Sequence, residues 1–142
     1  MKRVLSIACV LFAFVFAVSL AAQAPAKIAS EADYAATMKE VGSLNGALTK
    51  AIKGGDAAEA SKAVPRLETL FKSVHAYWAD KKVADAQTAA QTAVTSLGQI
   101  SKALASNDMA GAETARATLA AQCMGCHKEH REKTPEGGWK MK

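Results

Sequence analysis

The sequence predicts an all-α protein, an antiparallel up-down-up-down four-helix bundle. Half of the 142 residues are apolar but only 6% are aromatic, and alanine dominates, which suits closely packed helices better than a sheet. Helix start and stop signals divide the chain after residue 30 into four amphipathic segments. Because the connections between these segments are short, we expect sequential helices to be antiparallel neighbours.

The first 24 residues have the pattern of a secretory signal peptide and precede the predicted bundle. Lys2 and Arg3 form a basic start, residues 4–20 are an apolar run, and small residues follow. We expect cleavage between residues 21 and 24, which leaves 25–142 as one exported, periplasmic domain with no stable membrane insertion. An uncleaved anchor is the alternative, since the apolar run nearly spans a bilayer. Cys9 lies in this leader.

The first helix is predicted from Glu31 to Lys53. Ser30 is its expected N-cap, and Gly54-Gly55 is its stop signal. Apolar residues recur every three or four positions and therefore form one face of the helix: Tyr34, Met38, Val41, Leu44, Leu48 and Ile52.

The second helix is predicted from its N-cap Asp56 to about Trp78, and the third from about Val83 to Ala105. Both carry an apolar stripe at helical spacing. Pro65 is expected to kink the second helix or to separate its first turn, because proline lacks the backbone donor and clashes with the preceding turn.

The fourth helix is predicted from Met109 to about Lys133, with Asn107-Asp108 as its cap. Thr134-Pro135 and Gly137-Gly138 should end it and leave a short tail containing Trp139. The chain also has a weak internal repeat. Thr49-Lys50-Ala51-Ile52 recurs 52 residues later as Ser101-Lys102-Ala103-Leu104, and the same offset relates Asp56 to Asp108 and Leu67 to Leu119.

The segment Cys123-Met124-Gly125-Cys126-His127 has the C-x-x-C-H spacing of c-type haem attachment. Thiols three residues apart on a helix share a face, where both can form thioethers to one porphyrin. His127 then follows as the proximal iron ligand. One covalent haem c is therefore the predicted cofactor, and export agrees with it because thioether attachment takes place outside the cytoplasm.

Two other readings of the cysteine pair stay open. A redox dithiol would need a strand–helix context, and no strand pattern precedes the motif. A zinc site would need two further ligands, for which the mature chain offers only His75 and His130.

The charge gives no indication of nucleic-acid binding. The formal charge is +5, but without Lys2 and Arg3 the chain has 16 basic and 13 acidic residues, or +3. Two haem propionates would lower this to about +1. Basic residues near the C-terminus would steer an acidic redox partner, although interleaved glutamates also fit an ordinary solvated face: Lys128, Arg131, Lys133, Lys140 and Lys142, with Glu129, Glu132 and Glu136.

A C-x-x-C-H motif on the last helix of an exported four-helix chain resembles the cytochrome c′ family, the class II c-type cytochromes. The resemblance covers essentially the whole mature chain. In class I cytochromes the motif comes early, whereas only fifteen residues follow His127 here. The family has a basic residue four after the haem-binding histidine, and Arg131 matches it. One helical turn would place Arg131 near the haem, to hold a propionate or tune the imidazole.

The resemblance also implies where the distal ligand would lie. In the family it comes from the first helix, some eight residues before a glycine, and alignment on Gly46 places Met38 there. Low-spin members have Met at this position, and five-coordinate members have a non-ligating residue. Without the resemblance, a methionine on a helical apolar stripe is more often a core residue, and Met38 fits that stripe. His75 is a further candidate ligand, and His130 stands where the family often has Tyr, as a propionate partner or a solvated residue.

The motif and the leader predict a non-enzymatic, periplasmic electron carrier with redox proteins as partners. The resemblance implies His127/Met38 ligation and a homodimer through the first two helices. The alternative is a five-coordinate haem protein that binds nitric oxide or carbon monoxide. A peroxidase is less well supported, because no acid–base constellation is visible.

Overall fold

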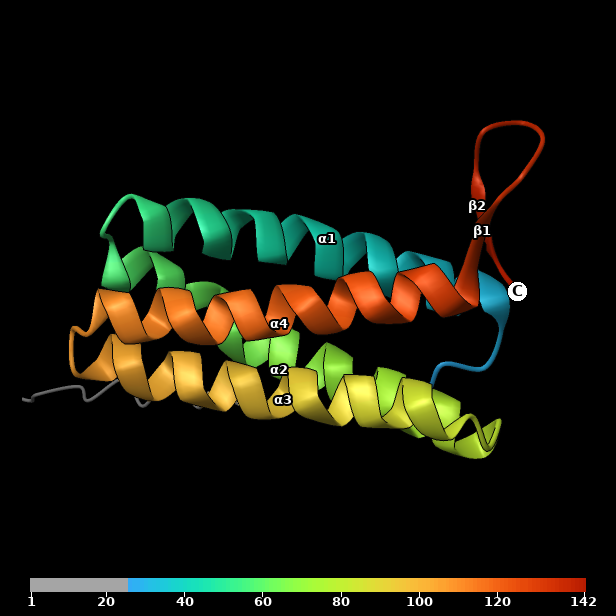
Figure 1. Ribbon diagram of the computed structural model, residues 1–142, viewed down its shortest axis with the longest axis horizontal. Helices are drawn as coiled ribbons and strands as arrows, with labels where there is room; N and C mark the ends of the chain where they lie inside the picture. The colour runs from blue at the N-terminus through green and yellow to red at the C-terminus, as the bar shows by residue number, and fades with distance from the viewer. Residues whose placement is uncertain (1–25) are drawn as a thin grey trace, which may run out of the picture.

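The computed structural model describes residues 26–142, so the expected signal peptide lies outside the described residues. Four helices pack against one another: α1 Glu31–Lys53, α2 Ala57–Asp80, α3 Ala84–Ala105 and α4 Met109–His130. Each helix runs opposite to the one before it (Figure 1), so the fold is a four-helix bundle with antiparallel sequential neighbours. Two short strands follow, β1 Arg131–Lys133 and β2 Trp139–Met141. Within residues 26–142, no helix combines the length and the apolar character required to span a bilayer.

The predicted caps explain where the helices begin. The Ser30 hydroxyl accepts a hydrogen bond from the Asp33 backbone N–H at 3.1 Å, and the Asp33 carboxylate accepts one from the Ser30 N–H at 3.0 Å. This capping box satisfies two backbone donors that α1 itself leaves unpaired. The carboxylates of Asp56 and Asp108 accept in the same way at the starts of α2 and α4.

All three connections between helices have the same backbone geometry. The middle residue of each has a positive φ: 72° at Gly55, 59° at Lys82 and 56° at Asn107. The next N–H bonds the carbonyl five residues earlier, at 3.0, 3.1 and 2.8 Å respectively. This pattern is the Schellman motif, in which a left-handed residue closes the helix end. Each connection spans only three residues and leaves no slack between the helices that it joins.

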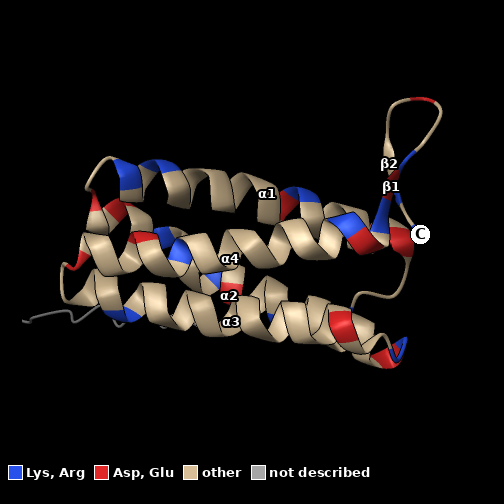
Figure 2. Ribbon diagram, in the orientation of Figure 1, with Lys and Arg blue, Asp and Glu red and all other residues tan. Residues whose placement is uncertain are grey.

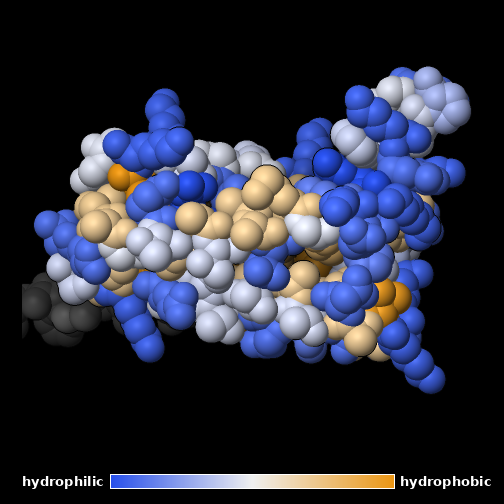
Figure 3. All heavy atoms as spheres, in the orientation of Figure 1, coloured by the Kyte–Doolittle hydropathy of each residue, from blue (hydrophilic) through white to orange (hydrophobic). Residues whose placement is uncertain are grey.

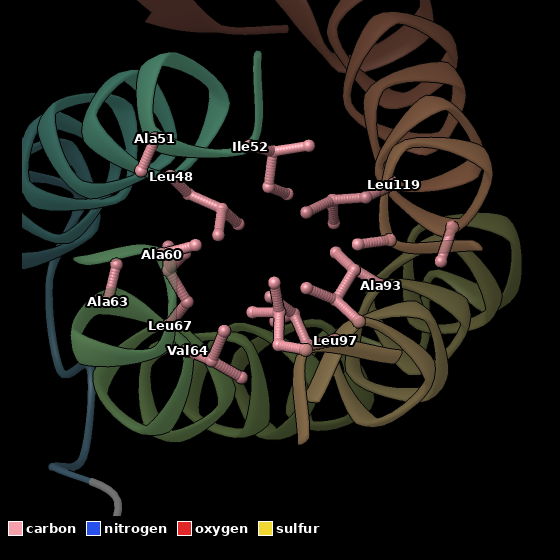
Figure 4. Packing of buried hydrophobic residues seen from close by; sticks show 14 of the residues in the cluster. Leu48, Ala51, Ile52, Ala60, Ala63, Val64, Leu67, Ala93, Leu97 and Leu119 are labelled. Atoms are coloured by element: carbon pink, nitrogen blue, oxygen red, sulfur yellow. The ribbon is translucent and has the colours of Figure 1, made fainter. Parts of the chain in front are cut away.

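The main core fills the half of the bundle where α1 ends and α4 begins. Figure 4 shows side chains from all four helices directed towards one another there, and Leu48, Leu67, Leu97 and Leu119 are almost fully buried. The offset of 52 residues is visible in this packing, because Leu48 and Ile100, Ala60 and Ala112, and Leu67 and Leu119 are all core residues. A second, aromatic cluster lies apart from it, formed by Ile28, Val74, Tyr77, Trp78, Ala86 and Ala90.

Pro65 does not separate the first turn of α2, which is one continuous helix through it. Pro65 is exposed, while its neighbour Val64 and nearby Leu67 are buried on the opposite face. Burial of that face holds the helix together in spite of the missing backbone hydrogen bond.

The predicted end of the fourth helix is wrong. α4 ends at His130, and the residues beyond it form an antiparallel hairpin in which Arg131 pairs with Met141 and Lys133 with Trp139. Pro135 disfavours helical backbone at Thr134. Gly137, with φ +83°, then allows the chain to reverse, and the Thr134 N–H bonds the Gly138 carbonyl at 3.0 Å. The expected tail with Trp139 is therefore a strand.

Candidate functional site

A cavity of about 650 Å³ lies between the first half of α1 and the last half of α4, with smaller contributions from α2, α3 and the hairpin. α1 and α4 contact each other far less than the sequential helix pairs do, which leaves room between them. The volume falls within the range of about 300–1,000 Å³ that is usual for cofactor sites. The cavity lies towards the end of the bundle where α4 finishes and α1 starts.

The two cysteines of the motif lie on α4, and both line the cavity. Their thiols are unpaired with each other and half-buried. Burial raises the pKa of the Cys123 thiol, and the neighbouring Cys126 raises it further. Burial also raises the pKa of Cys126, with a smaller contribution from the negative charge of Asp85. Both sulfurs are therefore held as neutral thiols at the wall of an apolar site.

His127 is the next residue on α4 and lines the same cavity. Burial lowers the pKa of its imidazole, and the positive charge of Arg131 lowers it further. A lowered pKa keeps the imidazole neutral at physiological pH, which is the form that can donate a lone pair to iron.

Met38 reaches the cavity from α1, across from the motif. Its half-buried side chain packs against both the main core and the aromatic cluster. The structure thus brings Met38, Cys123, Cys126 and His127 together at one cavity. His75 is half-buried on α2 and is not among the residues that line it.

Arg131 also lines the cavity, but not through a helical turn as the sequence analysis expected. Its backbone is extended, with φ −132° and ψ 135°, and it begins β1. The Nε atom is buried without a hydrogen-bond partner among residues 26–142. The guanidinium carbon lies 3.8 Å from the centre of the Trp139 ring.

His130, the last residue of α4, contacts residues of α2 and α3. Its Nε2 lies 2.6 Å from the Asp85 carboxylate of α3, and its ring centre lies 5.2 Å from that of Trp78. This contact joins the end of α4 to the start of α3. The hydrogen bond from His130 lowers the pKa of Asp85.

Sequence reasoning missed the aromatic residues beside the site. The ring centres of Tyr34 and Tyr77 are 4.8 Å apart, and the Trp78 indole donates to the Tyr34 hydroxyl at 3.1 Å. Burial is the main cause that raises the pKa of Tyr34 to about 12. In the sequence, Tyr34 is one residue of an apolar stripe, and no local pattern links it to Trp78, 44 positions away.

Two of the basic residues near the C-terminus, Lys128 and Lys140, form ion pairs with acidic neighbours. Figure 2 shows both signs of charge on the hairpin, and Figure 3 shows hydrophilic residues gathered over that end of the molecule. Lys140 Nζ lies 3.1 Å from a carboxylate oxygen of Glu132. Such pairing fits an ordinary solvated face, and the steering of an acidic redox partner stays a prediction.

The residues around the cavity fit a haem. Two thiols, a neutral imidazole and a thioether line it. A buried guanidinium nitrogen has no acceptor among residues 26–142, and a propionate would supply one. No cluster of three or more His, Cys, Asp or Glu side chains that could hold a metal ion occurs in the described part of the chain. Comparisons of the chain with models of protein families, with curated proteins and with solved structures found no match.

Proposed function

We propose that this protein is an exported monohaem c-type cytochrome of the class II kind that transfers single electrons between redox proteins. The observation that carries the proposal is the meeting of Cys123, Cys126, His127 and Met38 at one cavity. A covalently bound haem would supply reversible one-electron chemistry at its iron. The chain would hold it through the two sulfurs, with His127 on one side and Met38 on the other.

The surroundings of the cavity support electron transfer by a stable, six-coordinate centre. Its lining is mostly apolar, with alanine, valine and phenylalanine side chains beside the motif: Ala35, Val41, Phe71, Val74, Ala86 and Ala90. Such a lining excludes water and favours the less charged, reduced state. With Met38 as a second ligand beside His127, the potential would be raised further and the iron would have no open position for a small molecule.

The first experiment tests covalent attachment. The chain is expressed with its leader in a host equipped for c-type haem ligation, and the mass and optical spectrum of the purified protein are recorded. We expect one covalently attached haem for each chain, seen as added mass, and no covalently attached haem in the Cys123→Ala/Cys126→Ala variant. Colourless wild-type protein with two titratable thiols would contradict the proposal.

The second experiment tests the distal ligand. The oxidised wild-type protein should be low-spin with the weak far-red band of methionine ligation, and Met38→Ala should lose this band and bind carbon monoxide when reduced. Met109→Ala is the matched control, because Met109 is also partly buried but packs only against the main core, away from the cavity. A high-spin wild-type protein that binds carbon monoxide readily would support gas binding instead.

A further inference from the structure

The C-terminal hairpin borders the cavity. Side chains two residues apart on a strand share a face, and the register places Arg131 opposite Met141 and Lys133 opposite Trp139. Arg131, Trp139 and Met141 of this face line the cavity. Lys140 of the other face lines it too, with its Nζ 3.1 Å from a Glu132 carboxylate oxygen. The hairpin is therefore part of the wall of the site, although Figure 1 shows its tip standing clear of the bundle.

The base of the hairpin is fixed to the helices. The Tyr77 hydroxyl of α2 lies 3.6 Å from the Met141 sulfur, and Met141 packs against the aromatic cluster. The backbone N–H of Lys142 bonds the His130 carbonyl at 3.1 Å, and its Nζ donates to the Lys128 carbonyl at 2.8 Å. These contacts hold β2 against the end of α4 and so fix the position of Trp139.

Trp139 in turn positions the guanidinium of Arg131. The 3.8 Å separation is that of a guanidinium stacked on the indole face, while Lys133 Nζ lies further away at 5.6 Å. Stacking uses the face of the guanidinium and leaves its in-plane N–H groups available as donors. Trp139 is 52% exposed, so burial in a core does not account for its position.

We propose that the hairpin is a strap that holds Arg131 in place for one haem propionate, with Trp139 as the positioning residue. The inference rests on the proposed function. A propionate would accept the hydrogen bond that the buried Nε of Arg131 lacks among the described residues, and both groups would be charged. The strap thus favours a porphyrin that carries free carboxylates.

The test measures how much the propionate carboxylates contribute to the affinity for the porphyrin. We expect the full chain carrying Cys123→Ala/Cys126→Ala to bind haem reversibly, without thioethers, so that its affinity for haem and for haem dimethyl ester can be measured by optical titration. In this background we expect Arg131→Ala to weaken haem binding on the order of tenfold and to leave ester binding unchanged. Trp139→Ala should weaken haem binding about two- to fivefold, again without affecting the ester.

Two further variants distinguish positioning from general support of the fold. Trp139→Phe should restore the preference for haem over its ester, because an aromatic face is retained. Lys133→Ala, on the same face of the hairpin but not among the residues lining the cavity, should leave that preference unchanged. In the Arg131→Ala variant, Trp139→Ala should have no further effect, since the two residues act as a unit.

Equal losses for haem and its ester in Trp139→Ala, or an unchanged preference, would overturn the inference while the proposed function stands. Failure of the double cysteine variant to bind either porphyrin, together with colourless wild-type protein, would overturn both.

Discussion

At the scale of single residues, the two thiols of the motif are less acidic than ordinary cysteine. Burial raises the pKa of both Cys123 and Cys126. Because the thiolate is the nucleophile, we expect iodoacetamide to alkylate the haem-free folded chain more slowly than the chain unfolded in urea, with the pH midpoint shifted upward. Mass spectrometry after timed quenching measures both rates. Midpoints equal to or below those of the unfolded chain would show that the thiols are not held in an apolar wall.

The contact between Asp85 and His130 should appear in the acid stability of the haem-free chain. The hydrogen bond from His130 lowers the pKa of Asp85 below its usual 3.8. The folded chain then binds fewer protons than the unfolded chain in that range, so the stabilisation is present above about pH 4 and is lost as the pH falls further.

Asp85→Asn should therefore reduce the difference between the urea midpoints measured at pH 6 and at pH 3. Asp80→Asn, an exposed aspartate at the end of α2, is the matched control and should leave the difference as it is in the wild type. The same reduction in both variants would assign the acid loss to net charge and not to this hydrogen bond.

At the scale of elements, the sequence predicts three of the four helices closely and fails at the end of the last. Ser30, Asp56 and Asp108 are local caps, so the boundaries that they set could be found from neighbouring residues alone. Arg131-Glu132-Lys133 has good helix propensity, and its extended form depends on pairing with residues 139–141. The spacing of apolar residues does not predict that pairing, although Pro135 and Gly137-Gly138 do mark a turn.

Pro65 offers a direct way to stabilise α2. Its ring is exposed in an otherwise continuous helix, so replacement removes no buried contact and restores a backbone donor. We expect Pro65→Ala to raise the free energy of unfolding by up to about 3 kcal/mol, as measured by urea denaturation monitored by circular dichroism.

Lys72→Ala is the control for this change, because Lys72 is also exposed on α2. It should alter the free energy of unfolding by less than about 0.5 kcal/mol. A neutral or destabilising Pro65→Ala would mean that the proline contributes to the folded state in a way that the helix geometry does not show.

At the scale of the whole molecule, the sequence identifies the residues of the candidate site better than their surroundings. Cys123, Cys126 and His127 are found from their spacing, and Met38 from a family resemblance and an apolar stripe. The structure brings all four to one cavity. The contributions of Asp85, Trp139 and Met141 depend on contacts between residues far apart along the chain, which no short motif encodes.

The uneven packing predicts where the haem-free protein opens most easily. The buried residues of α4 are Ala112, Ala115 and Leu119, all in its first half, and those of α1 begin at Val41. We expect backbone amides in the first half of α1 and the last half of α4 to exchange with solvent faster than those of α2 and α3, as followed by hydrogen exchange and mass spectrometry. Haem attachment should slow exchange in these two segments. Uniform protection of all four helices before attachment would contradict the prediction.

The three short connections also determine which helices of the bundle can separate transiently. α1 is tied to α2, α2 to α3 and α3 to α4 by turns without slack, whereas no connection joins α1 to α4 directly. The α2–α3 pair therefore lies at the middle of the chain, and α1 and α4 are each joined to it by only one turn. We expect α1 and α4 to separate from each other most easily, so that a planar porphyrin could enter between them while all four helices remain folded.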